Sequence, residues 1–233
     1  MTLRLSDVNL SYPDGEDGRV AAIAGANLTV QPGQVTALTG PSGCGKSSVL
    51  AVAGTLIRPD SGLVEIDGTA VGELSEPDRA RIRRDQIGFV FQNDNLLPDL
   101  TALEQLLLVA HLRGARPSRH RAEARDLLAQ VGLTGQENKL PRQLSGGMRQ
   151  RVNIARALMG QRTVLLIDEP TSALDQERGR AIIELIVRLA RERDLAALLV
   201  THDLATLNVG QAGGVDGLVR MLDGRLEDRA LVS

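Results

Sequence analysis

Residues 40–47 constrain the fold of this chain more than any other segment. They read Gly-Pro-Ser-Gly-Cys-Gly-Lys-Ser, which fits the pattern of a glycine, four residues, and then Gly-Lys-Ser or Gly-Lys-Thr. An apolar run at 35–38 precedes the segment, and a helical run begins at residue 48. Glycines let a backbone wrap closely around an anion, and the start of a helix presents its positive end to it. The sequence therefore predicts a phosphate-binding loop between a strand and a helix.

Lysine usage supports this interpretation. The chain has 27 basic residues, of which only Lys46 and Lys139 are lysines, so arginine serves wherever any positive charge suffices. Lys46 stands where an amine can reach the β- and γ-phosphates of a nucleotide, and the hydroxyl of Ser47 can bind Mg²⁺. A glycine-rich turn that matches by chance is the alternative, and the rarity of lysine argues against it.

Two acids follow a second apolar segment. Residues 164–167 are Val-Leu-Leu-Ile and precede Asp168 and Glu169. Open parallel sheets place ligand chemistry at the carboxyl ends of their strands. Asp168 can then hold Mg²⁺ through water, while Glu169 acts as the general base toward an attacking water. Acids that only cap the next turn are the alternative, and the phosphate-binding loop upstream argues against it.

The remaining pattern predicts an α/β chain. Apolar strands separated by a helix imply a parallel sheet that is covered on both faces. The first third favours strands and tight turns, and the middle of the chain favours helices. The predicted strands are 3–11, 26–30, 35–38, 63–66, 164–167 and 196–200, and the predicted helices are two within 101–133, one from 146 to about 159, and one at 176–193.

Charge and cysteine content narrow the classes of function. The 27 basic and 29 acidic residues give a formal charge of 27 − 29 = −2, so a nucleic-acid partner is not expected. The single cysteine, Cys44, excludes an intrachain disulfide. No apolar run approaches the ~20 residues that span a bilayer. A role at a membrane would therefore require a partner chain.

A second glycine-containing helix start lies 23 residues before Asp168. Residues 144–150 read Leu-Ser-Gly-Gly-Met-Arg-Gln and open the helix predicted from 146. One molecule gains nothing obvious from two phosphate-binding helix starts. The arrangement resembles the ATP-binding cassette (ABC) family, in which this signature segment faces the phosphate-binding loop of a second copy. A serine cap with a flexible glycine pair is the alternative for the segment alone.

The resemblance covers essentially the whole chain and implies its organisation. It implies the α/β fold of a P-loop NTPase, with a mostly parallel core sheet, an N-terminal antiparallel β subdomain and a helical insert. The chain would form one nucleotide-binding domain over residues 1–233. Its core would span 1–92 and 163–233, and its helical subdomain about 93–162.

The resemblance also assigns roles to individual residues. Gln92 matches the Q-loop, Asp175 the D-loop, and His202 the histidine that senses the γ-phosphate. Tyr12 matches the aromatic residue that stacks on adenine, although a tyrosine at a strand end before a proline is the alternative. The implied catalytic residues are Lys46, Gln92, Glu169 and His202, and the implied magnesium ligands are Ser47, Gln92 and Asp168. The implied ATP contacts are Tyr12, Gly40, Pro41, Ser42, Gly43, Cys44, Gly45, Lys46, Ser47, Ser48, Gln92, Ser145, Gly146, Gly147, Asp168 and Asp175.

The implied activity is hydrolysis of ATP with Mg²⁺ by a head-to-tail homodimer. The family couples this dimer to membrane subunits, here a separate transmembrane permease at the cytoplasmic face of the membrane. Asn95, Leu96 and Leu97 are candidate contacts, with ordinary core packing as the alternative. The segment before the signature lacks the run typical of exporters that fuse cassette and membrane domain.

Residues 79–104 look most like the branch that includes the MacB and LolD cassettes, which serve lipoprotein release and macrolide or peptide efflux. Three alternatives remain open. They are an FtsE-like cassette that signals across the membrane in cell division, a soluble ABC ATPase acting on nucleic acid or ribosomes, and a small-molecule kinase. The signature segment argues against the kinase, and the short insert argues against the soluble ATPase.

An arginine cluster at residues 113–125 has two interpretations. It could contact anionic lipid, or it could be a solvated helix face. From the pattern alone we favour the solvated face.

Overall fold

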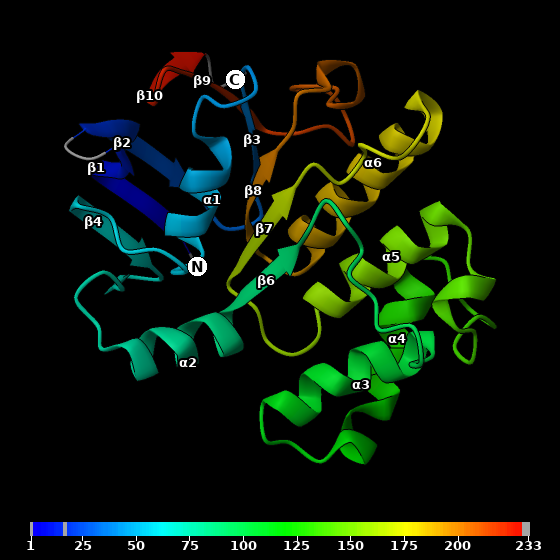
Figure 1. Ribbon diagram of the computed structural model, residues 1–233. Helices are drawn as coiled ribbons and strands as arrows, with labels where there is room; N and C mark the ends of the chain where they lie inside the picture. Colours follow the sequence, from blue (N-terminus) through cyan, green and yellow to red (C-terminus); the bar gives the residue numbers. More distant parts are fainter. Residues whose placement is uncertain (1, 16–17, 230–233) are drawn as a thin grey trace.

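The computed structural model describes residues 2–15 and 18–229 (Figure 1). An antiparallel sheet occupies one side of the molecule and has the strand order β2-β1-β4-β5. Alternating apolar residues of β1 face the interior, as expected for a sheet with one buried face. Its strands are β1 (Leu3–Asp14), β2 (Gly18–Val30), β4 (Ser61–Ile66) and β5 (Thr69–Ala70).

The second sheet has the order β10-β9-β3-β8-β7-β6. Five of its strands run parallel, and β10 pairs antiparallel to β9 through the turn at Asp223 and Gly224. The central strands are mostly apolar and almost completely buried, which agrees with the predicted mostly parallel sheet. Its strands are β3 (Val35–Thr39), β6 (Ile87–Val90), β7 (Val164–Asp168), β8 (Ala196–Val200), β9 (Gly217–Leu222) and β10 (Arg225–Arg229).

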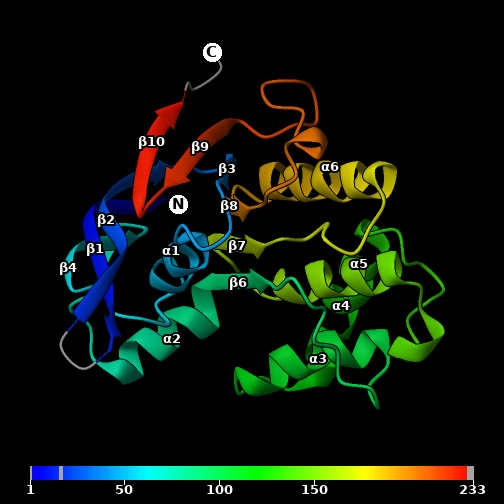
Figure 2. The same cartoon turned by 45° about the horizontal axis from the view of Figure 1, so that its top comes forward.

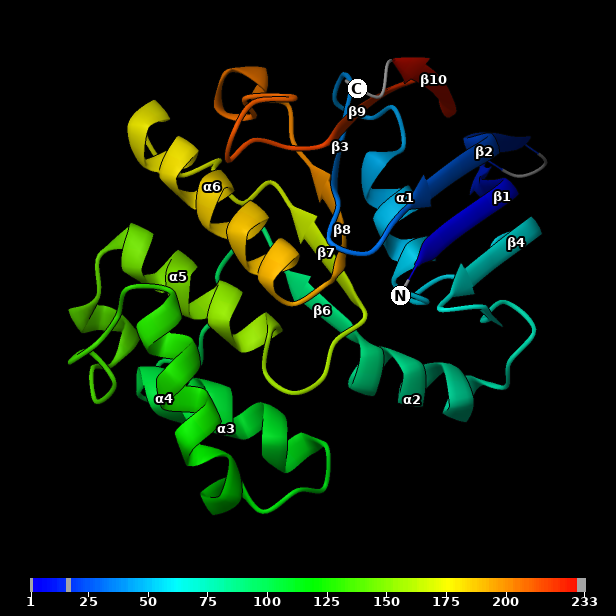
Figure 3. The ribbon, with the colours of Figure 1, turned by 180° about the vertical axis from the view of Figure 1, so that it is seen from behind.

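Helices cover both faces of the second sheet (Figures 1 and 2). Helix α1 lies between the two sheets, and α5 and α6 lie on the opposite face, with α3 and α4 beyond α5 (Figure 3). The helices are α1 (Lys46–Ala53), α2 (Glu76–Gln86), α3 (Ala102–Leu112), α4 (Arg121–Gln130), α5 (Gly146–Ala157) and α6 (Gln176–Glu192), with the short 3₁₀ helices η1 (Pro117–His120), η2 (Pro141–Gln143) and η3 (Leu204–Thr206). No helix within residues 2–15 and 18–229 combines the length and the apolar character needed to cross a membrane.

The core has two parts that share the central strands. Leu165 and Ile167 of β7 face the cluster formed with α3, α4, α5 and α6. Val164 and Leu166 face the cluster formed with α1 and the antiparallel sheet. Successive side chains of a strand point to opposite faces, so β7 contributes to both clusters. This packing fixes the carboxyl end of β7, where Asp168 and Glu169 follow.

The predicted elements are confirmed, with differences at their ends. The helix predicted to about residue 159 ends at Ala157. Leu158 and Met159 are buried, and Gly160 follows with a φ of 86°, a conformation typical of the end of a helix. Helix α2 has no counterpart among the predicted elements. Ser75 caps α2 by accepting a hydrogen bond from the Asp78 N–H. A capping serine followed by Glu and Pro is typical of the start of a helix, so the sequence did contain a signal for α2.

Candidate nucleotide-binding site

The loop at residues 40–47 joins β3 to α1 and curls around its own lysine. The Lys46 Nζ donates hydrogen bonds to the carbonyl oxygens of Gly40 at 2.9 Å and Pro41 at 2.8 Å. A Cβ on Gly40 would lie 2.2 Å from the Met221 carbonyl oxygen, and one on Gly45 would lie 2.1 Å from the Ala22 carbonyl oxygen. Both glycines also have positive φ, so only glycine fits either position.

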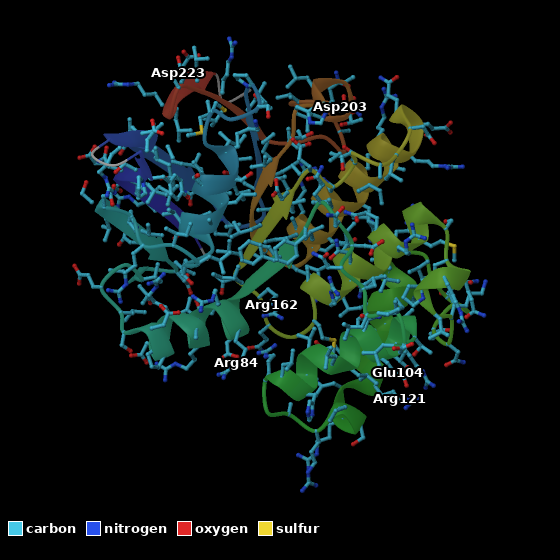
Figure 4. The ribbon with its side chains drawn as sticks, in the orientation of Figure 1. Arg84, Glu104, Arg121, Arg162, Asp203 and Asp223 are labelled. Atoms are coloured by element: carbon cyan, nitrogen blue, oxygen red, sulfur yellow. The ribbon has the colours of Figure 1, made fainter. Side chains whose placement is uncertain are left out.

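An open cleft of about 450 Å³ lies beside this loop. Its walls come from the loop, the start of α1, the segment after β6, and the segments after β7 and β8. The lining residues are Ser42, Gly43, Gly45, Lys46, Ser47, Ser48, Gln92, Asp168, Glu169, Val200 and His202. The structure thus brings together the predicted residues of four segments far apart in the sequence. Figure 4 labels Asp203, the neighbour of His202, near this end of β8.

Backbone geometry after β7 aims Glu169 into the cleft. Glu169 has φ of 45°, a left-handed conformation that costs a non-glycine residue on the order of 1–2 kcal/mol. Its N–H donates to the carbonyl oxygen of Val200 at 2.9 Å, which ties the ends of β7 and β8 together. The Glu169 Oε2 lies 2.9 Å from the Nδ1 of His202, an exposed side chain that contacts the carboxylate from the solvent side. Such strain at a cleft is typical of functional positions.

The environment of the cleft shifts the pKa of Asp168. Burial raises its pKa above the usual value, and the neighbouring negative charge of Glu169 adds to the rise. The ammonium group of Lys46 opposes this shift. A buried carboxylate with a raised pKa gains most from a cation placed beside it.

The donor set fits Mg²⁺. Ser47, Gln92 and Asp168 line the same cleft and offer hydroxyl, amide and carboxylate oxygens. These are hard ligands of the kind that Mg²⁺ prefers, usually one or two carboxylates completed by water and substrate phosphates. Within the described residues no cluster of three or more His, Cys, Asp or Glu forms a closed metal cage. An open site of this kind leaves room for phosphate oxygens.

The remaining predicted residues around the loop have distinct environments. The Tyr12 hydroxyl lies 3.3 Å from the Ser48 Oγ, and its ring is 40% exposed at the start of α1. Pro41 is exposed on the loop. The thiol of Cys44 instead points inward and packs in the cluster around α1, so only its backbone is available to a ligand. An exposed aromatic ring beside a phosphate-binding loop is suited to stacking on a base.

The signature segment lies apart from this cleft. Ser145 caps α5 by accepting a hydrogen bond from the Met148 N–H at 3.3 Å. A Cβ on Gly147 would meet nothing within 4 Å, and one on Gly146 would meet only the tip of Arg149 at 3.8 Å. Ser145 and Gly147 border a separate hollow of about 270 Å³, which is formed with α6. Asp175 lies nearby as the cap of α6 and accepts from the Arg178 N–H at 2.9 Å.

Three side chains of α5 hold the segment around Gln92. Arg149 belongs to the signature segment, whereas Asn153 and Arg156 lie outside the motifs identified from the sequence. The Arg149 Nε lies 2.8 Å from the Asp94 Oδ2, and Arg156 donates to the carbonyl oxygens of Asp94 and Asn95. The buried Asn153 donates to the carbonyl oxygen of Phe91 at 3.1 Å. No local signal could have found these contacts, because they join segments about 60 residues apart.

Comparison with known proteins identifies the family. The model of the ABC transporter family matches residues 23–172, more than half of the chain. The chain is 42% identical over 212 residues to the lipoprotein-releasing system ATP-binding protein LolD 2 of Caulobacter vibrioides, and this region covers 91% of each protein. It is 41% identical over 225 residues to LolD of Ruegeria pomeroyi, which covers 97% of this chain and 96% of that protein.

Solved structures agree. A dimeric structure of MJ0796, described as a bacterial ABC transporter cassette, has a TM-score of 0.85 at 35% identity and covers 99% of both chains. A post-hydrolysis dimer of MJ0796 bound to ADP and Pi has a TM-score of 0.85 at 36% identity and also covers 99% of both chains. The family match, the identities and the shared architecture lead to one conclusion: this chain belongs to the ABC transporter family.

Proposed function

We propose that this protein hydrolyses ATP as the ATP-binding subunit of an ABC transporter of the MacB/LolD type. The observation that carries the proposal is the shared cleft, which brings Lys46 of the phosphate-binding loop and the Glu169–His202 pair to one space. Hydrolysis requires a group that binds the phosphates and a group that accepts a proton from water. A lysine and a carboxylate on the same cleft supply these two functions.

The chain's residues divide the chemistry. Lys46 exchanges the carbonyl oxygens of Gly40 and Pro41 for phosphate oxygens of the nucleotide. A water oxygen then attacks the γ-phosphorus, and its proton passes to a carboxylate oxygen of Glu169 as the bond to the β-phosphate oxygen breaks. The Nδ1 of His202 lies 2.9 Å from the Oε2 of that carboxylate. When bound to Ser47, Gln92 and Asp168, Mg²⁺ would neutralise charge on the β- and γ-phosphate oxygens.

The signature segment supports a head-to-tail homodimer. Ser145 and Gly147 border a different hollow from Lys46, so the signature segment is placed away from the nucleotide of its own chain. In a second copy they would face the first copy's cleft and donate backbone N–H groups to the γ-phosphate. ATP then favours the closed dimer, because only that state offers the second set of donors, and hydrolysis removes the phosphate that joins them.

A separate permease is the partner we propose at the membrane. The relatives named LolD are ATP-binding proteins of lipoprotein-releasing systems. We therefore expect this chain to drive a membrane subunit of a related system. Asn95, Leu96 and Leu97 are the proposed contacts, and Leu97 is 46% exposed. Arg156 of α5 donates hydrogen bonds to the carbonyl oxygens of Asp94 and Asn95. A movement of this segment would therefore be transmitted to α5. The site would work at the cytoplasmic face of the membrane.

Solution mass of Glu169→Gln with and without ATP–Mg²⁺ tests the proposal. We expect hydrolysis to fall by ~10²- to 10⁴-fold, because the proton acceptor is lost while the binding residues remain. The nucleotide then stays intact and the variant should convert from monomer to dimer only when ATP is added.

The Lys46→Ala, Glu169→Gln double variant is the matched control. It should remain monomeric with ATP, because the loop has lost its phosphate contact. Dimerisation of the double variant by ATP, or wild-type rates in Glu169→Gln, would contradict the proposed roles.

A further inference from the structure

One short and largely exposed segment carries an excess of positive charge. Residues 111–125 contain five arginines and two histidines but only one acid, Glu123. With neutral histidines their net charge is 5 − 1 = +4, whereas the whole chain carries −2. The other residues therefore sum to −2 − 4 = −6. This positive segment is the end of α3, the turn η1 and the start of α4.

The structure fixes this corner firmly to the rest of the molecule. Arg113 lies 3.5 Å from a carboxylate oxygen of Asp85. Glu123 accepts a hydrogen bond from the Gly160 N–H at 2.7 Å and lies 2.8 Å from the Nδ1 of His120. These contacts use Arg113 and Glu123 internally. They leave the other arginines of the segment as the groups that face outward.

Four arginines of the corner are available to an external partner. Arg116, Arg119, Arg121 and Arg125 are exposed, and none makes a hydrogen bond through its side chain or an ion pair with another residue that the structure describes. Arg121 contributes slightly to the lowered pKa of Glu104, which lies near it in Figure 4, but the main causes there are hydrogen bonds from Thr101. Most of the positive charge at this corner is thus unpaired.

The same arginines are placed against the electrostatic preference of α4. Arg121 is the first residue of the helix and Arg119 precedes it, although the positive end of the helix dipole repels cations there. Arg121 and Arg125 are also four residues apart on the exposed face, where like charges repel. His120 occupies the cap position without a capping hydrogen bond. Within the described residues, Glu123 is the one acid in this first turn, and Arg121 and Arg125 have only minor charge interactions, with Glu104 and Glu137. An anion outside the chain would supply the pairing that these contacts leave unmade.

An apolar side chain accompanies the charges. Leu112, the last residue of α3, is 67% exposed, more than any other large apolar side chain that the structure describes. Cationic groups beside an exposed leucine suit the interface of a membrane, where headgroups meet acyl chains. No aromatic residue lies within 111–125, so the stacking platform typical of single-stranded nucleic-acid sites is absent from this segment.

We propose that the corner formed by Leu112, Arg116, Arg119, Arg121 and Arg125 lies against a membrane surface that contains anionic lipid. The corner lies toward the other end of α3 from Leu97. The backbone of Leu97 is hydrogen-bonded to the side chain of Gln105, and Leu112 follows Gln105 by about 10 Å along the helix. A permease contact at one end and a lipid contact at the other would fix the orientation of the subunit at the membrane.

Co-sedimentation of the full chain with lipid vesicles tests this proposal. Vesicles of phosphatidylcholine alone are compared with vesicles that also contain phosphatidylglycerol. We expect binding only to the anionic vesicles, weakening as salt is raised. Replacing Arg116, Arg119, Arg121 and Arg125 by Gln should weaken binding by on the order of 100-fold or more, since each basic group contributes about fivefold. Leu112→Ser should weaken it by about tenfold.

A matched variant controls for net charge. Arg142, Arg180, Arg220 and Arg225 are also exposed and also lack such contacts with described residues, so their replacement by Gln changes the charge equally. This variant should bind the vesicles as the wild type does. Equal loss in both variants, no binding to anionic vesicles, or tighter binding of an RNA oligonucleotide through the same four arginines would overturn the proposal. Vesicle binding needs no hydrolysis, so its failure is separable from failure of the proposed ATPase.

Discussion

Helices α1 and α5 both begin at a glycine-containing turn, but other segments of the chain pack tightly only against the turn of α1. Around the start of α1, the neighbouring carbonyl oxygens of Ala22 and Met221 leave no room for a Cβ on Gly45 or Gly40. Around the start of α5, a Cβ on Gly147 would meet nothing. The first turn is glycine-rich because of the chain's own packing, and the second has no such internal reason.

The difference teaches where each turn finds its partner. A glycine without an internal steric reason points to close approach by something outside the chain. The cleft beside α1 already contains Asp168, Glu169 and His202, whereas the hollow beside Ser145 has no carboxylate that could act as a base. One turn belongs to a site that lacks only its ligand and a second set of donors. We expect the other turn to supply donors to a site outside its own chain.

The largest expected effect comes from mixing two inactive variants. Lys46→Ala damages the first turn, and Gly147→Asp places a negative charge in the second, where α5 tolerates an acid but phosphate does not. Each variant alone should hydrolyse no ATP. An equal mixture should recover about a quarter of the wild-type rate, because half of the dimers are mixed and each of those has one intact site of two.

Titration of one variant into the other provides the measurement. No recovery at any ratio would mean that both turns serve the nucleotide of one chain. This result would contradict the inference that the turn of α5 serves a second copy.

A smaller effect separates the two turns by thermal unfolding. Gly45→Ala should lose about 2–4 kcal/mol of stability, or roughly 5–10 °C in Tm, since its Cβ would overlap the Ala22 carbonyl oxygen. Gly147→Ala should leave Tm unchanged or slightly higher, since alanine favours a helix. The same Gly147→Ala variant should nevertheless weaken the ATP-dependent dimer. A large fall in Tm for Gly147→Ala would show that its turn has an internal steric role after all.

Asp168→Asn should raise the stability of the nucleotide-free protein at pH 7 by up to about 1 kcal/mol while it abolishes hydrolysis. Burial and Glu169 raise the pKa of Asp168, so its ionised form destabilises the fold. Stability from the protonated form is present at low pH and is lost as pH rises through the raised pKa. The difference in Tm between variant and wild type should therefore shrink as pH falls toward 4. A difference that grows on acidification would reverse the assigned sign.

The smallest effect concerns the link between the two regions. The Asp94–Arg149 ion pair joins the segment after Gln92 to α5, and it is about one-third exposed. A double-mutant cycle with Asp94→Asn and Arg149→Gln should give a coupling energy of about 0.5–1 kcal/mol in denaturant unfolding. The more exposed Arg188–Glu192 pair on α6 is the control, and its coupling should be weaker. Equal couplings would mean that the link is an ordinary surface pair.

Sequence patterns predicted the parts of the site that backbone chemistry specifies locally. A tight phosphate-binding loop requires glycines at set positions, and a strand buried on both faces requires a continuous apolar run. The elements around residues 40–47, 164–168 and 196–200 were therefore predictable, and the structure confirms them as β3–α1, β7 and β8. The placement of Lys46 and Glu169 at one cleft followed from strand ends meeting at one edge of the sheet.

Contacts between distant segments could not be predicted in this way. The Tyr12–Ser48 and Arg149–Asp94 contacts join residues 36 and 55 positions apart, and no periodicity relates them. Helix α2 was missed for another reason. It buries little apolar surface, and Arg79 and Arg83 instead fix it to the carbonyl oxygen of Thr55. A helix held by tertiary hydrogen bonds lacks the apolar stripe that sequence analysis detects.

The side chains of β7 alternate between two apolar clusters, and this has a consequence for how the protein unfolds. Residues of one strand fill both the cluster around α1 and the cluster around α3 to α6. Melting of either cluster would remove the packing from one face of β7 and so destabilise the strand that the other cluster also needs. The nucleotide loop and the helical region therefore share one cooperative unit. We therefore expect damage in either part to reach both parts and to disturb the cleft.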